Sequence, residues 1–197
     1  MSRGRTLPRR FYARDAREVA VDLLGKVIVH GERRARIVET EAYLGAIDAG
    51  SHAYRGPTAR NATMFGPPGH LYVYFTYGMH WCANAVCGDH DGIAVLLRAA
   101  APIAGIDEMR LARGPRASRS RDLCSGPAKL CQAFGIAKLH DGSDLVTGDR
   151  DVVIVDDGTP PPSVPGNSVR IGLSAGAEHP WRWYVPSDEN VSKAPRS

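Results

Sequence analysis

The segment from His70 to His80 constrains the fold of this chain more than any other part of the sequence. Its residues alternate in character, which predicts a strand with two different faces, Leu71, Val73 and Phe75 on one side and Tyr72, Tyr74 and Thr76 on the other. The pair Tyr77 and Gly78 then predicts the tip of a β-hairpin. The strand therefore needs an antiparallel partner directly after it in the chain.

Short segments with strand and helix patterns continue along the rest of the chain. Strands are expected at 26–30, 35–43, 71–77, 83–86, 93–98, 152–155, 169–173 and 181–185. Helices are expected at 15–24, 107–113 and 125–135. The segment 44–69 is rich in glycine and proline and predicts a long loop, which in a compact domain is usually functional. We expect an α+β fold over residues 1–197: a single compact domain with a mostly antiparallel, curved β-sheet, flanking helices and a protruding β-hairpin.

The cationic residues are mostly arginine, and they are unevenly placed. The net charge is only +4, but 21 of the 25 cationic side chains are arginine. Arginine binds phosphate in a bidentate manner and stacks on bases, so this usage permits a nucleic-acid partner without requiring one. Residues 1–10 are expected to form a basic arm that is ordered only when something binds it. Residues 110–121 form a second basic run. The acidic stretch 141–157 should face away from a polyanion. Residues 186–197 are expected to form a flexible tail.

Other features of the sequence exclude several classes of protein. No run approaches the roughly 18 apolar residues of a membrane span, and the first ten residues lack the apolar segment of a secretory signal. We therefore expect an intracellular protein without a membrane partner. The four cysteines form two pairs with spacings of five and seven, which do not match zinc sites. Reduced, buried thiols are favoured over a metal site that would include His90.

The densest group of chemically capable residues is Ile37–Tyr43. Alternation in a strand places Glu39, Glu41 and Tyr43 on one face together with Ile37. The pattern alone favours a solvated outer face of the sheet. The functional alternative is a carboxylate beside a stacking aromatic ring, where a desolvated glutamate can act as a general base.

Two further features have both a structural and a functional interpretation. Arg98 ends an otherwise apolar run, and a buried arginine needs a carboxylate or a ligand, for which Glu39 or Glu41 is the obvious candidate. A purely structural ion pair explains Arg98 equally well. The tyrosines from 72 to 77 could be surface residues of a strand, or a platform that stacks bases beside a hairpin tip that wedges between base pairs.

Taken together, four blocks resemble the alkyladenine (3-methyladenine) DNA glycosylase family, the type first described in mammals and also found in bacteria. The blocks are Arg36–Gly45, Asn61–Phe65 with Gly69–Met79, Val95–Ala99 and Leu123–Gln132. Any one of them alone is a weak signal, but their combination is specific. The resemblance extends from Leu23 to Val185, which is most of the chain.

This resemblance implies a monofunctional DNA glycosylase of base excision repair. Such an enzyme flips alkylated or deaminated purines out of duplex DNA and hydrolyses the N-glycosidic bond with a glutamate-activated water. By resemblance Glu41 is the general base, and Arg98 and the backbone carbonyl of Ile171 are further contacts of the water. Glu39 keeps a structural or supporting role.

The resemblance also implies how the DNA is held. Four residues would bind the extruded base: Tyr43, His52, Tyr74 and Asn84. Among them, Asn84 would exclude guanine. Three further residues would contact the duplex: Tyr77, Met79 and His80. Tyr77 would fill the space that the base leaves. The matched pocket has no lysine, so no Schiff-base lyase step is expected, and neither a metal nor an organic cofactor is implied. The protein would act as a monomer on double-stranded DNA containing damaged purines, with 1–10 and 110–121 touching phosphates.

Two other functions remain as alternatives. A catalytically inactive nucleic-acid-binding module would use the same tyrosines and would bind in a salt-dependent manner without forming an abasic product. An O-glycosidase built on Glu39 and Glu41 would need carboxyl groups on opposite sides of a sugar. Two residues on one face of one strand have poor geometry for that reaction.

Overall fold

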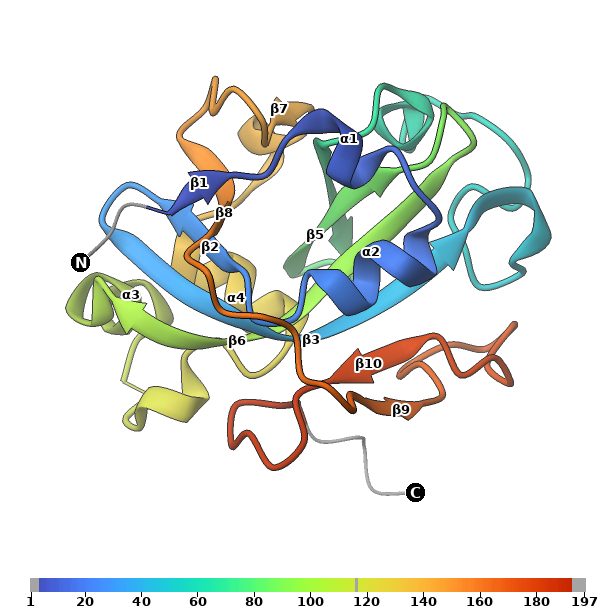
Figure 1. The fold of residues 1–197 in the computed structure, drawn as a ribbon. Helices are drawn as coiled ribbons and strands as arrows, with labels where there is room; N and C mark the ends of the chain where they lie inside the picture. The colour runs from blue at the N-terminus through green and yellow to red at the C-terminus, as the bar shows by residue number, and fades with distance from the viewer. Residues whose placement is uncertain (1–3, 116, 193–197) are drawn as a thin grey trace.

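The computed structural model describes residues 4–115 and 117–192. Within these residues one sheet is formed by β1 (Arg5–Thr6), β2 (Val27–His30), β3 (Arg33–Leu44), β4 (His70–Thr76), β5 (His80–Cys87), β6 (Ile93–Ala104), β7 (Ser143–Asp144), β8 (Val152–Asp156), β9 (Gly166–Ser168) and β10 (Arg182–Tyr184). Neighbouring strands follow the order β1-β8-β2-β3-β6-β5-β4-β7, and β10 pairs with both β3 and β9. Every strand pair is antiparallel. The sheet curls rather than lying flat (Figure 1). The predicted α+β class with an antiparallel, curved sheet is confirmed.

In the described part of the chain, four α-helices flank the sheet: α1 (Arg9–Tyr12), α2 (Ala16–Asp22), α3 (Ile106–Arg113) and α4 (Pro127–Phe134). The side chain of Asp15 caps α2 by accepting a hydrogen bond from the amide of Arg17. Helix α4 begins with Pro127 and ends at Gly135, whose φ of 68° is the left-handed conformation typical of a helix end. The three predicted helices are thus present, with ends that differ by at most two residues, and α1 was not predicted.

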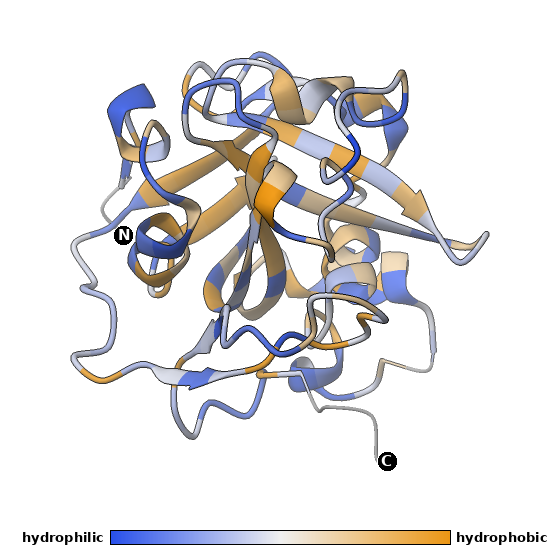
Figure 2. Ribbon diagram, turned by 90° about the vertical axis from the view of Figure 1, so that its right-hand side faces the viewer, coloured by the Kyte–Doolittle hydropathy of each residue, from blue (hydrophilic) through white to orange (hydrophobic). Residues whose placement is uncertain are grey.

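The two faces of the sheet are buried in different ways. On one face, the main core cluster contains Leu23 beside α2 and Phe134 of α4, both fully buried. A smaller cluster contains one residue from each of three strands, Tyr72 of β4, Val86 of β5 and Ala94 of β6. These residues pack with Ala53 and Met64 of the 44–69 segment. Because side chains of a strand alternate between faces, the smaller cluster lies on the opposite side of the sheet. Figure 2 shows the hydrophobic residues concentrated along these central elements.

The position of β3 decides where the chemistry can lie. This strand pairs with β6 along most of its length, with β2 through residues 33–36 and with β10 through residues 39–41. Residues 39–41 of β3 therefore have a neighbouring strand on both sides. Side chains at this point can be fully removed from water.

The first residues of the chain differ from the predicted arm. Arg5–Thr6 pairs with β8, and α1 follows almost directly. Leu7 is buried, and the Arg9 guanidinium lies 2.6 Å from the carboxylate of Asp144. The prediction of an arm ordered only by a bound partner is therefore wrong for residues 4–10, because strand pairing and an ion pair within the chain hold this segment. Residues 1–3 lie outside the described residues.

Two predictions for the C-terminal part are also wrong. No strand forms at 169–173, and β9 ends at Ser168, because the amide of Ile171 donates to the side chain of Glu41 rather than to a neighbouring strand. The segment 186–192 is not a flexible tail, since Ser192 is buried and donates to Glu39. The remainder of the predicted tail, 193–197, lies outside the described residues.

Candidate active site

Glu39 and Glu41 lie at the centre of the sheet. At both positions β3 pairs with β10 on one side and β6 on the other, and both side chains are 0% exposed. The predicted solvated outer face is therefore wrong. The local pattern could not show this, because the covering segments come from the far end of the chain.

A bulge separates the glutamates from the first half of β3. The register with β6 shifts between Ile37 and Glu39. Ile37 packs into the main core cluster, whereas Glu39 and Glu41 both contact Arg98. The predicted shared face therefore holds for Glu39, Glu41 and Tyr43 but not for Ile37, because an extra residue in a bulge reverses the alternation.

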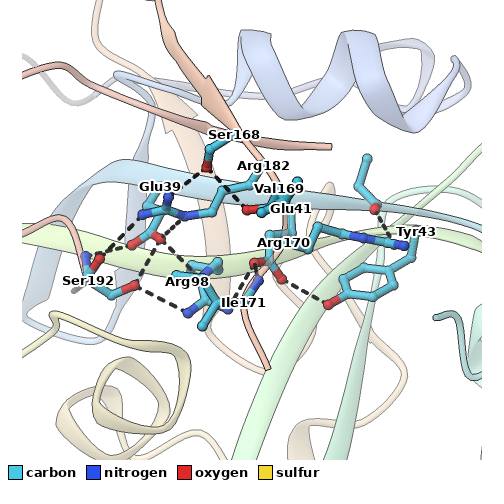
Figure 3. A network of polar contacts seen from close by, with 11 residues as sticks. Glu39, Glu41, Tyr43, Arg98, Ser168, Val169, Arg170, Ile171, Arg182 and Ser192 are labelled. Carbon is cyan, nitrogen blue, oxygen red and sulfur yellow. Dashed lines mark hydrogen bonds and ion pairs between the residues drawn. The ribbon is translucent and has the colours of Figure 1, made fainter. Parts of the chain in front are cut away.

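Glu39 is enclosed by hydrogen-bond donors (Figure 3). Its Oε1 accepts from Nε of Arg98 at 3.0 Å, from Nε of Arg182 at 2.6 Å and from the hydroxyl of Ser192 at 2.8 Å. Its Oε2 accepts from the amide of Ser192 at 2.7 Å. We call Glu39, Arg182 and Ser192 the Glu39 cluster. Its carboxylate is held by two cations and a backbone amide, an arrangement that suits a supporting role.

Glu41 has fewer partners and a different neighbour (Figure 3). Its Oε1 lies 3.0 Å from Nη1 of Arg98 and accepts from the amide of Ile171 at 2.8 Å. Its Oε2 accepts from the hydroxyl of Tyr43 at 2.8 Å. A carboxylate oxygen has two lone pairs, so Oε2 keeps one acceptor site beyond Tyr43. The expected pairing of Arg98 with a glutamate is confirmed for both Glu41 and Glu39.

The protonation of the partners follows from their surroundings. Burial of Arg98 lowers its pKa, but the charges of Glu41 and Glu39 outweigh burial, so the pKa is raised and the guanidinium stays cationic. Burial, then the negative charge of Glu41, raises the pKa of Tyr43 well above its usual value. Tyr43 therefore keeps its proton and acts as a donor to Glu41.

The four residues expected to bind a base line a single pocket. Tyr43, His52, Tyr74 and Asn84 share this pocket with Tyr72, a member of the stacking platform considered above, and with three residues that we did not predict: Gly50, Met64 and Leu173. The rings of Tyr72 and Tyr74 are stacked with centroids 5.4 Å apart and an interplanar angle of 23°. The His52 ring meets Tyr74 edge-on, with centroids 4.4 Å apart. The structure thus gathers three tyrosines and a histidine around one small space.

Polar contacts fix two of the pocket residues. Nδ1 of His52 lies 3.2 Å from the hydroxyl of Tyr72, and the amide of Asn84 donates to the carbonyl of Tyr72 at 3.3 Å. Partial burial, and then the charge of Arg60, lowers the pKa of His52. The imidazole is therefore neutral at pH 7, and no side chain that lines the pocket carries a formal charge.

Sheet register explains how residues far apart in sequence meet here. Glu41 lies opposite Leu96, Leu96 opposite Asn84, and Asn84 opposite Tyr72. Residues directly opposite one another in an antiparallel sheet point to the same face. This row places the buried carboxylate of β3 and the pocket residues of β4 and β5 on one side of the sheet.

The residues expected to contact the duplex do not join this pocket. Tyr77, Met79 and His80 are exposed at the turn between β4 and β5, and Tyr77 is 78% exposed. Three residues, 77–79, join the paired Thr76 and His80. The first two, Tyr77 and Gly78, have φ angles of 50° and 66°, which is the left-handed backbone of a tight hairpin turn. Because Tyr74 lies three residues earlier in β4, the tip is about 10 Å farther along the strand.

Sequence reasoning missed two buried arginines at the site. Arg182, between two tryptophans, holds Glu39, and Arg170 forms an ion pair with Asp48 in which both side chains are 0% exposed. The signal that singled out Arg98, a lone arginine among apolar neighbours, was also available for Arg182. Arg170 directly precedes Ile171, but nothing in its local pattern indicates a partner 122 residues away.

The structure also bears on metals, thiols and membranes. All four cysteines are buried, as predicted. Among residues 4–115 and 117–192, no group of three or more His, Cys, Asp or Glu side chains could hold a metal ion. The helices in these same ranges are too short or too polar to cross a bilayer.

Comparison with known proteins gives a consistent result. A family model described as methylpurine-DNA glycosylase (MPG) matches residues 10–189. A protein from Burkholderia lata named "putative 3-methyladenine DNA glycosylase" is 56% identical over 191 residues, which cover 96% of this chain and 92% of that protein. Proteins with the same name from Streptomyces avermitilis and Chlorobaculum parvum are 46% and 47% identical, over 94% and 92% of this chain and 90% and 88% of theirs.

Proposed function

This chain belongs to the methylpurine-DNA glycosylase family, and from that premise we propose that it is a monofunctional DNA glycosylase. In this proposal it flips alkylated or deaminated purines out of duplex DNA and hydrolyses the bond between base and sugar. It acts as a monomer in base excision repair. The observation that carries the proposal is the 2.8 Å contact between Oε2 of Glu41 and the hydroxyl of Tyr43, because Tyr43 also lines the pocket.

Glu41 is proposed as the general base. A water placed at the open acceptor site of Oε2 gives a proton to Glu41 while its oxygen bonds to C1′ of the sugar. The C1′–N bond breaks, and its electron pair leaves with the purine. Arg98, fixed between both glutamates, is proposed to hold this water together with the backbone carbonyl of Ile171.

The pocket is proposed to receive the extruded base. Tyr43, His52 and Tyr74 offer ring surfaces on which a purine can stack, and a positively charged alkylated purine is also attracted by π faces. Asn84 is proposed to discriminate against guanine. Because the lining contains no lysine, no covalent imine with the sugar is expected, and the product is an abasic site.

The exposed hairpin tip is proposed to enter the duplex. Tyr77 is the projecting ring, and Met79 and His80 flank it. A stiff, apolar side chain that fills the space of the missing base offsets part of the cost of unstacking. The short turn of three residues suits this role because it holds the ring at the end of two paired strands.

A basic surface beside Arg98 supports contacts to the DNA backbone. One hollow combines four cations with two acids and small residues: Arg98, Arg119, Arg121, Lys129, Asp122, Glu189, Ser125, Gly126, Val191 and Ser192. A second hollow shares Gly126 and Lys129 and continues to Arg113 and His80. We propose that the phosphates of one strand follow this surface from the site to the hairpin. Two of these cations also have carboxylate partners within the chain, Arg119 in Asp122 and Arg98 in the two glutamates, as Arg9 has in Asp144.

The test is alkaline cleavage of an end-labelled duplex that contains hypoxanthine or ethenoadenine at one position, with and without the protein. Cleavage at the lesion only after alkali, and only with protein, is the expected result. Cleavage without alkali would show a lyase step and contradict the monofunctional assignment. Salt-dependent binding without any cleavage, on these lesions and on methylated purines, would instead favour a catalytically inactive nucleic-acid-binding module.

A further inference from the structure

The ion pair between Arg170 and Asp48 lies directly behind the proposed site. Nη1 of Arg170 is 2.6 Å from Oδ2 of Asp48, and Nη2 is 2.7 Å from Oδ1, so the pair is bidentate. Asp48 follows the turn at the end of β3, and Arg170 follows β9. The pair therefore joins two segments that are far apart in the sequence.

Each partner also holds backbone on its own side of the junction. Arg170 donates to the carbonyl of Ala42 at 3.0 Å and to that of Gly176 at 2.7 Å. Asp48 accepts from the amides of Leu44 at 3.1 Å and Gly50 at 2.9 Å. The end of β3, the turn at 48–50 and the segment 170–176 are thus fixed to one another by a single pair of side chains.

The groups proposed for catalysis and base binding are attached to these same segments. The guanidinium of Arg170 lies 4.7 Å from the ring centroid of Tyr43 and 5.0 Å from that of Trp181, so it packs against both aromatic side chains. The next residue after Arg170 is Ile171, whose amide donates to Glu41. Both the ring of Tyr43 and a hydrogen bond of Glu41 therefore depend on where Arg170 lies.

The wall of the base pocket depends on the same contact. Gly50 and Leu173 line the pocket from the two joined segments. A Cβ on Gly50 would come within 2.9 Å of the side chains of Leu173 and Arg170 and of the Ala175 carbonyl, so the segments approach as closely as glycine allows.

We propose that Arg170 is a positioning residue for base excision: through Asp48 and Tyr43 it sets the plane of the pocket ring and the amide that orients Glu41. This inference rests on the proposed glycosylase function. Arg170 touches neither substrate nor water in this role. A lysine cannot replace it, because bidentate pairing and ring packing both need the planar guanidinium.

A purely structural role is the competing explanation. A buried ion pair is in general weak evidence for stability, since apolar residues of similar volume often stabilise as well or better. Arg170, however, packs against Tyr43 and directly precedes Ile171, and these two residues donate hydrogen bonds to Glu41. Positioning therefore predicts a change in the chemistry, beyond any change in the folded fraction.

The experiment compares Arg170→Lys with wild type in single-turnover excision of hypoxanthine from a duplex, from pH 5 to pH 9. We expect the maximal rate constant to fall about tenfold to a hundredfold, as for loss of positioning. The acid limb of the profile should move to higher pH, because Glu41 loses a donor that favours its carboxylate form. The half-saturating protein concentration should change less than the maximal rate constant.

The matched control is Arg36→Lys. Arg36 also forms a bidentate pair with an aspartate, Asp157, from a distant segment, with distances of 3.2 and 2.8 Å, but it lies away from the pocket. Its rate constant and pH profile should equal those of wild type. If Arg170→Lys gives an unshifted profile and a rate that falls only with the folded fraction, the role is structural and the inference is wrong.

Asp48→Asn supplies a second variant if Arg170→Lys does not fold. It keeps the shape and one acceptor of the pair, and the same loss of rate and shift of the acid limb are expected. An unshifted profile in a folded Asp48→Asn protein would likewise overturn the inference. Wild type separates the two proposals: if wild type does not excise any lesion, the proposed function fails, whereas equal excision by wild type and variants refutes only the positioning role.

Discussion

Glu39 and Glu41 are the same residue type, two positions apart on one strand, equally buried and both paired with Arg98. They differ in what surrounds their oxygens. In the Glu39 cluster, Oε1 has three donors and Oε2 a backbone amide. At Glu41, Oε2 has a single donor, and that donor is the pocket residue Tyr43.

This difference separates a carboxylate that holds the structure together from one that can do chemistry. A base needs an acceptor site that no protein donor occupies, and it needs a substrate beside it. Glu39 also keeps an acceptor site at Oε2 beyond the Ser192 amide, but Ser192, unlike Tyr43, does not line the base pocket. The charge of Glu39 instead keeps two buried arginines paired. Burial alone therefore does not distinguish the two glutamates, whereas the group beside the open oxygen of each does.

The substitution Glu41→Gln should have the largest effect of those that test this comparison. The amide cannot take a proton from water, so we expect single-turnover excision to fall about a thousandfold, within the range of general-base effects. Affinity for lesion-containing duplex should persist, because the pocket rings are unchanged. Fluorescence anisotropy and alkaline cleavage measure the two quantities on the same duplex. Retained excision would contradict the assignment of Glu41 as the base.

Glu39→Gln tests the other side of the comparison. Removing this charge leaves the buried Arg182 without its carboxylate partner and Arg98 with only Glu41. Breaking a buried pair in this way should lower the free energy of unfolding by about 3 kcal/mol. Urea denaturation measures this, and the excision rate of the protein that remains folded should change less than tenfold. A loss of rate as large as in Glu41→Gln, without loss of stability, would show that the two roles are assigned to the wrong residues.

The contrast between the two glutamates also marks how far the sequence alone can be interpreted. Alternation correctly placed Glu39, Glu41 and Tyr43 on one face, and the lone Arg98 correctly pointed to a carboxylate partner. The sequence of β3 could not show whether that face is exposed to solvent or buried. Its burial depends on β10 and on Ser192, which lie more than 140 residues after the glutamates in the chain. Nothing local distinguishes a covered strand from an exposed one.

The errors at the chain ends have the same physical origin. The first ten residues lack an acid, and their ion-pair partner Asp144 lies in a distant acidic stretch. The segment 169–173 has the composition of a strand, but Arg170 and Ile171 bind side chains of other segments instead of a strand ladder. Local composition predicts backbone tendency, and here long-range polar contacts overrode it.

A finer test removes one hydroxyl donor from each of the two glutamates. Tyr43→Phe removes the hydroxyl that donates to Glu41, and Ser192→Ala removes the hydroxyl that donates to Glu39. The loss at Tyr43 should slow excision about tenfold, since a hydrogen bond to a charged group contributes about 1.5 kcal/mol. The loss at Ser192 should change the rate less than threefold. Equal effects of the two variants on excision would remove the distinction between the sites.

The same pair of variants gives a test at alkaline pH. Because burial and then Glu41 raise the pKa of Tyr43 in the folded state, unfolding releases its proton once the pH exceeds the ordinary tyrosine value near 10. The contribution of Tyr43 to stability is therefore complete below pH 10 and is lost as the pH rises further. In Tyr43→Phe the decline of unfolding free energy above pH 10 should be shallower than in wild type, by at most about 1.4 kcal/mol per pH unit. Ser192→Ala should keep the wild-type slope, because serine does not titrate there, and a wild-type slope in Tyr43→Phe as well would show that Tyr43 ionises freely in the folded protein.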